Sequence, residues 1–140
     1  MSLAEDAQTF NWMMNSFVKE TAGVTDSVAV SSDGLLMARS NTLDDAGADQ
    51  VAAIISGFVS LGQGATRCFA FDELQQIIVA MKGGYLFVTA MGTAGCLGVV
   101  ATPRCDIGNV GYQMAMLVER AGVMLTPDLV DELKNLVSAR

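Results

Sequence analysis

The stretch from residue 50 to residue 66, QVAAIISGFVSLGQGAT, contains no charged residue, although the whole chain has a formal net charge of -7. The residues just before it resemble a helix start. Thr42 offers an N-cap hydroxyl, and Asp44 and Asp45 place carboxylates in the first turn, where they favour the positive end of the helix dipole. We therefore expect a helix that begins near Leu43 and contains the whole uncharged stretch.

Both sides of this predicted helix lack charged groups. At about 100° per residue, one broad side is apolar, as in a helix that packs on a core. That side consists of Val51, Ile54, Ile55, Phe58, Val59 and Leu61. The opposite side, where a surface helix would carry Lys and Glu, holds small residues that allow close backbone approach. These residues are Ala53, Ser56, Gly57 and Ser60. A second surface should therefore cover the helix, either within the domain or in another subunit.

Length and charge restrict the class of protein. A chain of 140 residues fits one domain with a single core. Its hydrophobic content of 51% favours either a very complete core or an apolar patch used for association. Fifteen acidic against eight basic residues argue against binding to nucleic acid or to anionic lipid. Glycines and glutamines also interrupt the uncharged stretch, which disfavours direct insertion into a membrane.

Several kinds of active site are excluded by composition. The chain has no histidine, which rules out a histidine base, triad or metal ligand. Cys68, Cys96 and Cys105 are odd in number and form no C-x-x-C pair, so we interpret them as reduced thiols of a cytoplasmic protein. No secretory signal pattern opens the sequence. Since no nucleophile constellation or phosphate-binding glycine loop is present, we expect no enzyme, no cofactor and no metal.

The remaining elements follow from local patterns. Apolar residues recur at helical spacing from residue 3 to residue 21, and period-2 alternation predicts a strand at 24–31. Asp33-Gly34 predicts a hairpin turn into a strand at 35–40. Three further strands, at 74–82, 85–91 and 96–101, are joined by short glycine-containing links and should form an antiparallel meander.

Two helices should complete the chain. Asp106 is placed to cap a helix that ends near residue 122, and Thr126-Pro127 should open a short last helix. Four side chains fall on the outward faces of the first and third predicted helices: Trp12, Tyr112, Met116 and Arg120. Trp12 either packs under another element or contacts a partner, and the other three form either a solvated face or a contact surface.

The order of elements, together with short motifs, resembles the Roadblock/dynein light chain 7 family, and closely its bacterial branch. The similarity extends over roughly residues 10–125. Its motifs are Asn11-Trp12-Met13-Met14, Val30-Ser31-Ser32-Asp33-Gly34-Leu35-Leu36, Gly84-Tyr85-Leu86-Phe87-Val88-Thr89-Ala90, Asp106-Ile107-Gly108 and Met114-Ala115-Leu117-Val118-Glu119-Arg120. The resemblance implies an α+β, profilin-like Roadblock domain at residues 1–125, of order α-β-β-α-β-β-β-α with a five-stranded antiparallel sheet. Residues 126–140 would form a C-terminal helical extension.

Members of that family are small non-enzymatic dimers. For this chain the resemblance implies a homodimer in which the second helix and the first meander strand join two sheets edge to edge. The interface would include Gln50, Ala53, Ile54, Ser56, Gly57, Ser60, Leu61, Gln75, Ile77 and Val79. Trp12, Tyr112, Met116 and Arg120 form the candidate partner surface.

Bacterial members resemble subunits that bind a small Ras-like GTPase and, in one operon type, stand beside a sensor kinase-like protein. They can raise GTP hydrolysis by repositioning the GTPase's own residues, without an arginine finger. The expected location is the cytoplasm, with recruitment to the membrane through a partner. The alternative is a small-molecule-sensing domain of the profilin, PAS or longin kind, suggested by nine methionines, whose thioethers adapt to irregular cavities.

Overall fold

The computed structural model describes residues 2–140 as five strands and four helices in the predicted order. The elements are α1 (Leu3–Glu20), β1 (Val24–Ser31), β2 (Leu36–Arg39), α2 (Asp45–Cys68), β3 (Gln76–Met81), β4 (Gly84–Ala90), β5 (Gly95–Ala101), α3 (Ile107–Met124) and α4 (Pro127–Ser138). All strand pairs are antiparallel, so the predicted α+β class with a five-stranded antiparallel sheet is confirmed.

The sheet has the strand order β2-β1-β5-β4-β3. The meander β3-β4-β5 is therefore confirmed, and its last strand pairs with β1, which joins the meander to the first hairpin. This order leaves β2 and β3 as the two edges of the sheet. β2 and β3, which precede and follow α2 in the sequence, are thus at opposite edges of the sheet.

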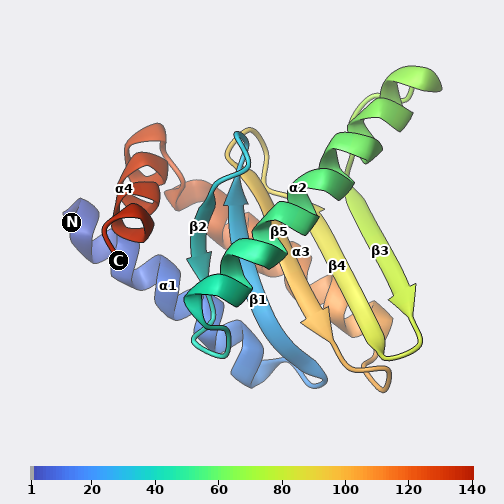
Figure 1. Ribbon diagram of the computed structural model, residues 1–140, viewed down its shortest axis with the longest axis horizontal. Helices are drawn as coiled ribbons and strands as arrows, with labels where there is room; N and C mark the ends of the chain where they lie inside the picture. Colours follow the sequence, from blue (N-terminus) through green and yellow to red (C-terminus); the bar gives the residue numbers. More distant parts are fainter. Residues whose placement is uncertain (1) are drawn as a thin grey trace.

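Helices cover both faces of the sheet, and each face has its own hydrophobic cluster (Figure 1). Buried side chains of α1, α3 and α4 form the larger cluster with one face, including Phe10, Met14, Met114 and Leu133. On the other face, α2 crosses the strands alone and buries Ala48, Ala52 and Ile55. Figure 1 shows that the end of α2 extends past β3, beyond the sheet edge.

The caps at the helix starts agree with the sequence in two of three cases. Asp106 accepts a hydrogen bond from the amide of Asn109, and the Thr126 hydroxyl accepts one from that of Leu129. α2 begins two residues after the predicted Leu43, and the predicted N-cap Thr42 was wrong. Its N-cap is Asp44, which accepts from the Gly47 amide, while the Thr42 hydroxyl lies 2.6 Å from that of Ser40.

The predicted apolar side of α2 was too broad. Ile54 is 46% exposed and Leu61 is 74% exposed. A helix that lies on a sheet buries only a narrow stripe of side chains, and in α2 this stripe is Ala48, Ala52 and Ile55. Leu61 belongs to the second half of α2, which approaches and passes the sheet edge. No helix among residues 2–140 is long and apolar enough to cross a bilayer.

Candidate functional site

The outer strand β3 is an open edge of the sheet. Ile78 and Met81 are 45% and 54% exposed, and no residue of β3 is fully buried. The strand QIIVAM carries no charge, whereas exposed edge strands usually carry charged residues or proline that prevent pairing with another chain. β3 therefore lacks the side chains that usually protect an exposed edge.

The pairing of β3 with β4 defines which peptide groups face this edge. The amide of Ala90 donates to the carbonyl of Gln75 at 3.1 Å, which makes these two residues a hydrogen-bonded pair. Hydrogen-bonded and non-hydrogen-bonded pairs alternate along an antiparallel ladder. The peptide groups of Gln76, Ile78 and Ala80 accordingly point away from β4, toward the open side.

The predicted interface residues on α2 lie mostly on its exposed side. Gln50, Ala53, Ile54, Gly57, Ser60 and Leu61 are exposed. A Cβ atom built on Gly57 meets nothing within 4 Å, so the space beside it is empty. Ser56 differs from the others, because it is half-buried and its hydroxyl lies 3.3 Å from a Cβ built on Gly34 in the β1–β2 turn. Ser56 therefore lies beside this chain's own hairpin, and its hydroxyl donates to the Ala52 carbonyl.

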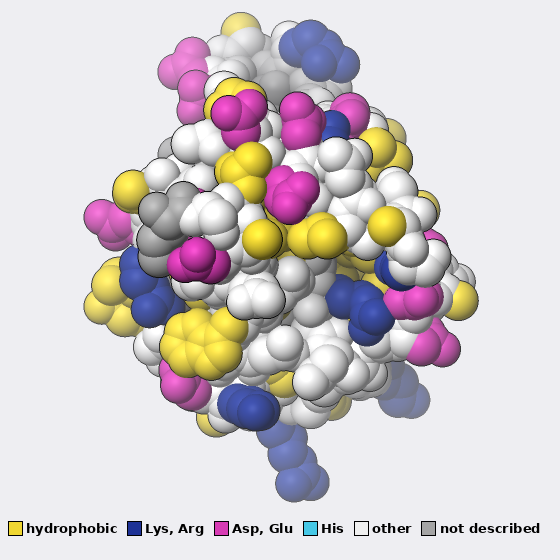
Figure 2. Space-filling model, turned by 90° about the vertical axis from the view of Figure 1, so that its left-hand side faces the viewer, with side chains coloured by type: hydrophobic (Ala, Val, Ile, Leu, Met, Phe, Trp, Pro, Cys, Tyr) yellow, Lys and Arg dark blue, Asp and Glu magenta, His cyan; other side chains and the backbone are white. Residues whose placement is uncertain are grey.

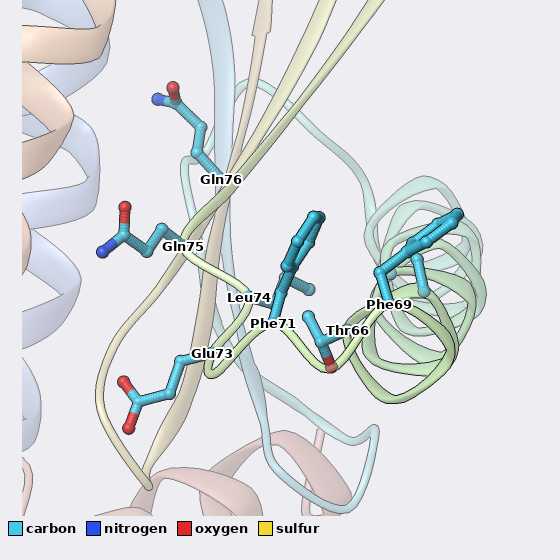
Figure 3. A pocket seen from close by; sticks show the side chains of 9 residues that line it. Thr66, Phe69, Phe71, Glu73, Leu74, Gln75 and Gln76 are labelled. Atoms are coloured by element: carbon cyan, nitrogen blue, oxygen red, sulfur yellow. The ribbon is translucent and has the colours of Figure 1, made fainter.

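The three predicted interface residues on β3 and before it have mixed orientations. Ile77 and Val79 are half-buried and pack against the cluster beneath α2. Gln75 is exposed, and its side chain extends away from α2 (Figure 3). The predicted strand is thus the open edge, but the predicted set holds its half-buried residues and leaves out the exposed ones, which are Gln76, Ile78, Ala80 and Met81.

Two aromatic side chains beside this edge were also missed. Phe69 and Phe71 are 64% and 68% exposed, and their ring centroids lie 5.6 Å apart. Between them, Ala70 has a φ of 56°, which turns the chain sharply after α2. Both rings lie on the α2 side of a surface hollow of about 500 Å³, while Glu73, Gln75 and Gln76 extend to the other side (Figure 3).

The candidate partner surface lies on the other face of the sheet. Trp12 of α1 and Tyr112 of α3 are 63% and 61% exposed, and Met116 is 40% exposed. Trp12 and Arg120 line the same small hollow of about 50 Å³ between these helices. Of the two alternatives stated for Trp12, packing under another element of this chain is not observed. α1 and α3 both pack in the cluster opposite α2. The start of α3 nevertheless reaches the β3 edge, because a Cβ built on Gly111, the neighbour of Tyr112, would lie 3.6 Å from the side-chain nitrogen of Gln76.

The titratable groups form no metal-binding cluster within residues 2–140. No group of three or more Cys, Asp or Glu side chains is placed to hold a metal ion there. The three cysteines are free, and burial raises the pKa of Cys96 to about 11. Met13, Met14, Met37, Met91 and Met114 are buried in the core, where they fill space between the helices and the sheet. The larger hollow is lined largely by exposed residues and opens to the surface.

These features define an α+β domain with one open, uncharged strand edge, a helix exposed beside it and a small hollow on the opposite face lined by Trp12 and Arg120. Residues 10–101 match the model of the Roadblock/LC7 domain, and the chain belongs to this family. The fold class and the family predicted from the sequence are thereby confirmed.

Solved structures agree with this assignment. A Roadblock/LC7 domain from Streptomyces avermitilis is 36% identical, with a TM-score of 0.76, over 82% of this chain and 98% of that chain. MglB from Myxococcus xanthus shares the fold at 16% identity and a TM-score of 0.76, over 83% of this chain and 94% of that one. The gliding protein MglB from Thermus thermophilus shares it at 15% identity and a TM-score of 0.73, over 89% and 91%. Among curated protein sequences no match is found.

Proposed function

We propose that this chain is a non-enzymatic homodimeric regulator or scaffold that binds a small Ras-like GTPase and modulates its GTP hydrolysis or nucleotide state in a bacterial signalling system. The observation that carries the proposal is the open β3 edge beside the exposed side of α2, in a chain of the Roadblock/LC7 family. The fold similarity to MglB gliding proteins and the bacterial sequence motifs support the GTPase as partner.

In the proposed dimer, the β3 strands of two copies pair antiparallel about a two-fold axis. The outward peptide groups of Gln76, Ile78 and Ala80 would form the new ladder. The two α2 helices then lie on the same face, with Ala53, Gly57 and the neighbouring small residues toward each other. The exposed Leu61, Phe69 and Phe71 extend this apolar surface at the end of α2. The arrangement would remove the uncharged edge and much of the exposed apolar area from water.

The hollow lined by Trp12 and Arg120 would stay accessible in this dimer, because it lies between α1 and α3 on the sheet face opposite α2. Exposed tryptophan, tyrosine and arginine are the residues most enriched at energetically important interface positions. We assign this surface to the GTPase. A sensor kinase-like protein is a further partner, and the expected location is the cytoplasm with recruitment to the membrane through a partner.

The chain would act on the GTPase without a catalytic residue of its own. Hydrolysis of GTP depends on how the GTPase orients its water and its switch residues, and a binding protein can change that orientation. None of the arginines in this chain is assigned the role of an arginine finger.

The test measures the mass of the protein in solution and the rate of GTP hydrolysis or nucleotide exchange by the partner GTPase. Light scattering at micromolar concentration should give twice the 14.7 kDa chain mass. A Ras-like GTPase encoded beside this chain should bind it and show a changed rate of GTP hydrolysis or nucleotide exchange. A monomer would contradict the proposed dimer, and the absence of both binding and a rate change would contradict the proposed regulation.

A further inference from the structure

The β3 edge carries opposite charges at its two ends. Asp72 and Glu73 precede the strand, Lys82 follows it, and residues 74–81 between them are uncharged. All three side chains are exposed, and within residues 2–140 none of them takes part in a salt bridge. Such an edge is complementary to an antiparallel copy of itself, because the acidic end of each strand then meets the basic end of the other.

The opposite edge of the sheet is different. There α4 packs against β2 and lies outside it (Figure 1). On this side of the molecule Figure 2 shows acidic and basic side chains among apolar ones, with no continuous apolar face. Of the two edges that the described residues form, β3 is therefore the open one.

The path of α2 shows where the helix passes the β3 edge. Ile55 lies against Gly98 of β5, and a Cβ built on Gly62 would lie 2.9 Å from Leu74 and 3.4 Å from Ile77. The helix rises about 10.5 Å from Ile55 to Gly62, and two strand spacings, from β5 to β3, measure about 9.6 Å. α2 therefore runs almost straight across the strands and crosses β3 between Leu74 and Ile77.

The last turns of α2 continue beyond this edge. Residues 63–68 extend about 9 Å past the crossing, in agreement with the projecting helix end in Figure 1. Beside this end lies the surface hollow of about 500 Å³, lined by Ala65 and Thr66 of α2 and by Phe71 and Leu74 ahead of β3. A strand added at the β3 edge would therefore run under the end of α2 and along the hollow.

The spacing of two α2 helices selects one register for a pair of β3 strands. Antiparallel pairing joins outward peptide groups to outward ones, so the two-fold axis passes at one residue of the strand. With the axis at Ile77, the two helices cross the strands about 10 Å apart, the usual distance between packed helices. With the axis at Gln76 they would lie about 3 Å apart and clash, and with the axis at Ile78 about 17 Å apart, without contact.

The same register pairs the charges. Ile77 is equally far along the chain from Asp72 and Lys82, so an axis at Ile77 places Asp72 of one copy opposite Lys82 of the other, at both ends of the paired strands. Glu73 would stand opposite Met81 of the second copy. Met81 is 54% exposed and, by strand alternation, faces the α2 side as Ile77 does, where the hollow can receive it.

We propose that Asp72 and Lys82 form the ion pairs that align two copies of this chain in this one register, and that Met81 of each copy fills the hollow of the other. The inference rests on the proposed function, because it concerns the dimer proposed there, and it names the side chains by which the β3 edge recognises itself. The two ion pairs favour this self-pairing over pairing with strands that lack complementary ends.

The experiment reverses the two charges one at a time. Asp72→Lys places like positive charges opposite each other at both ends of the paired strands, and Lys82→Asp places like negative charges there. Each variant alone should dimerise about tenfold more weakly than the unchanged chain in analytical ultracentrifugation at low ionic strength. Glu119→Lys makes the same change of net charge at an exposed position of α3 and should leave the affinity unchanged. Circular dichroism should show the same fold for all.

Mixing the two single variants tests the pairing itself. In the mixed dimer one copy is basic at both ends of β3 and the other is acidic at both, so two opposite-charge pairs form again. The mixture should therefore associate about as tightly as the unchanged chain, and so should the double variant Asp72→Lys with Lys82→Asp.

A cysteine pair tests the register. In a Cys68→Ser background, chains with Asp72→Cys and chains with Lys82→Cys should form a disulfide with each other on oxidation. Neither should do so alone, because equal positions would lie about 33 Å apart and a disulfide needs Cα atoms within about 7 Å.

The outcomes distinguish a failure of this inference from a failure of the proposed dimer. A monomeric unchanged chain would contradict the dimer and the ion pairs together. A dimer whose affinity is the same in both single variants, or a mixture no tighter than its components, would overturn the ion pairs alone. A disulfide formed by either cysteine variant by itself would overturn the register.

Discussion

Lys134 Nζ lies 3.2 Å from Oδ2 of Asp33, which precedes it by 101 residues. This contact joins α4 to the turn between β1 and β2. Asp33 also accepts a hydrogen bond from the Ser31 hydroxyl. This hydrogen bond has the largest effect and the contact with Lys134 the next, and together they lower the pKa of Asp33 below its ordinary 3.8. A turn that the sequence identifies from Asp33-Gly34 alone therefore also holds the last helix in place.

Asp33→Asn should weaken this attachment in a pH-dependent way. Because the pKa of Asp33 is lowered in the folded state, its contribution is complete above pH 3.8 and is lost as the pH falls through the folded value. The side chain is 54% exposed, so we expect a loss of less than about 1 kcal/mol in unfolding free energy at pH 7. Urea unfolding of wild type and variant should converge in acid. Asp131→Asn, at 3.7 Å from Lys134, is the control with a smaller effect, and a difference that persists unchanged in acid would contradict this account.

Gly98→Ala should destabilise the contact between α2 and the sheet. A Cβ built on Gly98 would overlap with Cδ1 of Ile55, which is fully buried, and would lie 3.2 Å from Cγ2 of Val28. Overpacking of this kind costs about 1–3 kcal/mol. Thermal and urea unfolding should show that loss.

Gly122→Ala is the matched control, because a Cβ there meets nothing within 4 Å in an exposed part of α3. It should raise stability by about 0.5–1 kcal/mol, since alanine is the better helix former. Equal stability of the two variants would contradict the close packing at Gly98.

Much of the fold is encoded in local patterns. The strand at residues 24–31 and the caps Asp106 and Thr126 agree with the structure because alternation and capping act over a few residues. The exposure of Ile54 and Leu61 was not predictable in the same way. It depends on where α2 crosses the sheet, which is a property of the packed fold.

In the candidate surfaces, too, some features follow from local sequence patterns and others depend on the packed fold. The absence of charge along α2 indicated an unusual exposed side, and Gly57 and Ser60 do lie on it. The exposed rings of Phe69 and Phe71 depend on the left-handed turn at Ala70, for which the sequence gives no glycine or asparagine signal. The cover of β2 by α4 joins segments that are far apart in the sequence and needs the tertiary structure.

The cysteines should differ strongly in reactivity. Cys68 is exposed at the end of α2, whereas Cys96 is buried and its pKa is raised from 9.0 to about 11, so its thiol is protonated at pH 8. In a Cys105→Ser background, iodoacetamide at pH 8 should modify Cys68 quickly and Cys96 only after unfolding. Adding Cys68→Ser should remove the fast phase. A fast phase that survives this change would contradict the burial of Cys96.

Trp12→Ala should weaken binding of the GTPase without changing the dimer. The indole is 63% exposed and lies on the face opposite α2, so its removal should leave the dimer mass measured by light scattering unchanged. If Trp12 is central to the interface, the loss should reach about 2 kcal/mol, or roughly 30-fold in Kd. Isothermal titration with the GTPase provides the measurement. Leu136→Ala, at a residue 50% exposed on α4, is the control and should bind normally. Equal affinities of the two variants would move the partner surface elsewhere.

Gly57→Glu should convert the dimer into a monomer that remains folded. A Cβ atom at this position meets nothing within 4 Å in the single chain, and the residue is exposed, so the fold can accept the larger side chain. In the proposed dimer the same position faces the α2 helix of the second copy, and two glutamates would be brought together near the two-fold axis, where their like charges repel. Light scattering at micromolar concentration should therefore give 14.7 kDa instead of twice that value.

Gly122→Glu is the matched control for this change. It places the same residue in a helix with equally empty space, but on α3, which lies on the other face of the sheet from α2. This variant should remain dimeric and should show the same circular dichroism as Gly57→Glu. If both variants stay dimeric, the dimer is not built on the exposed side of α2. If both become monomeric, added negative charge on an already acidic chain is the cause, and the position of the interface has to be assigned by other means.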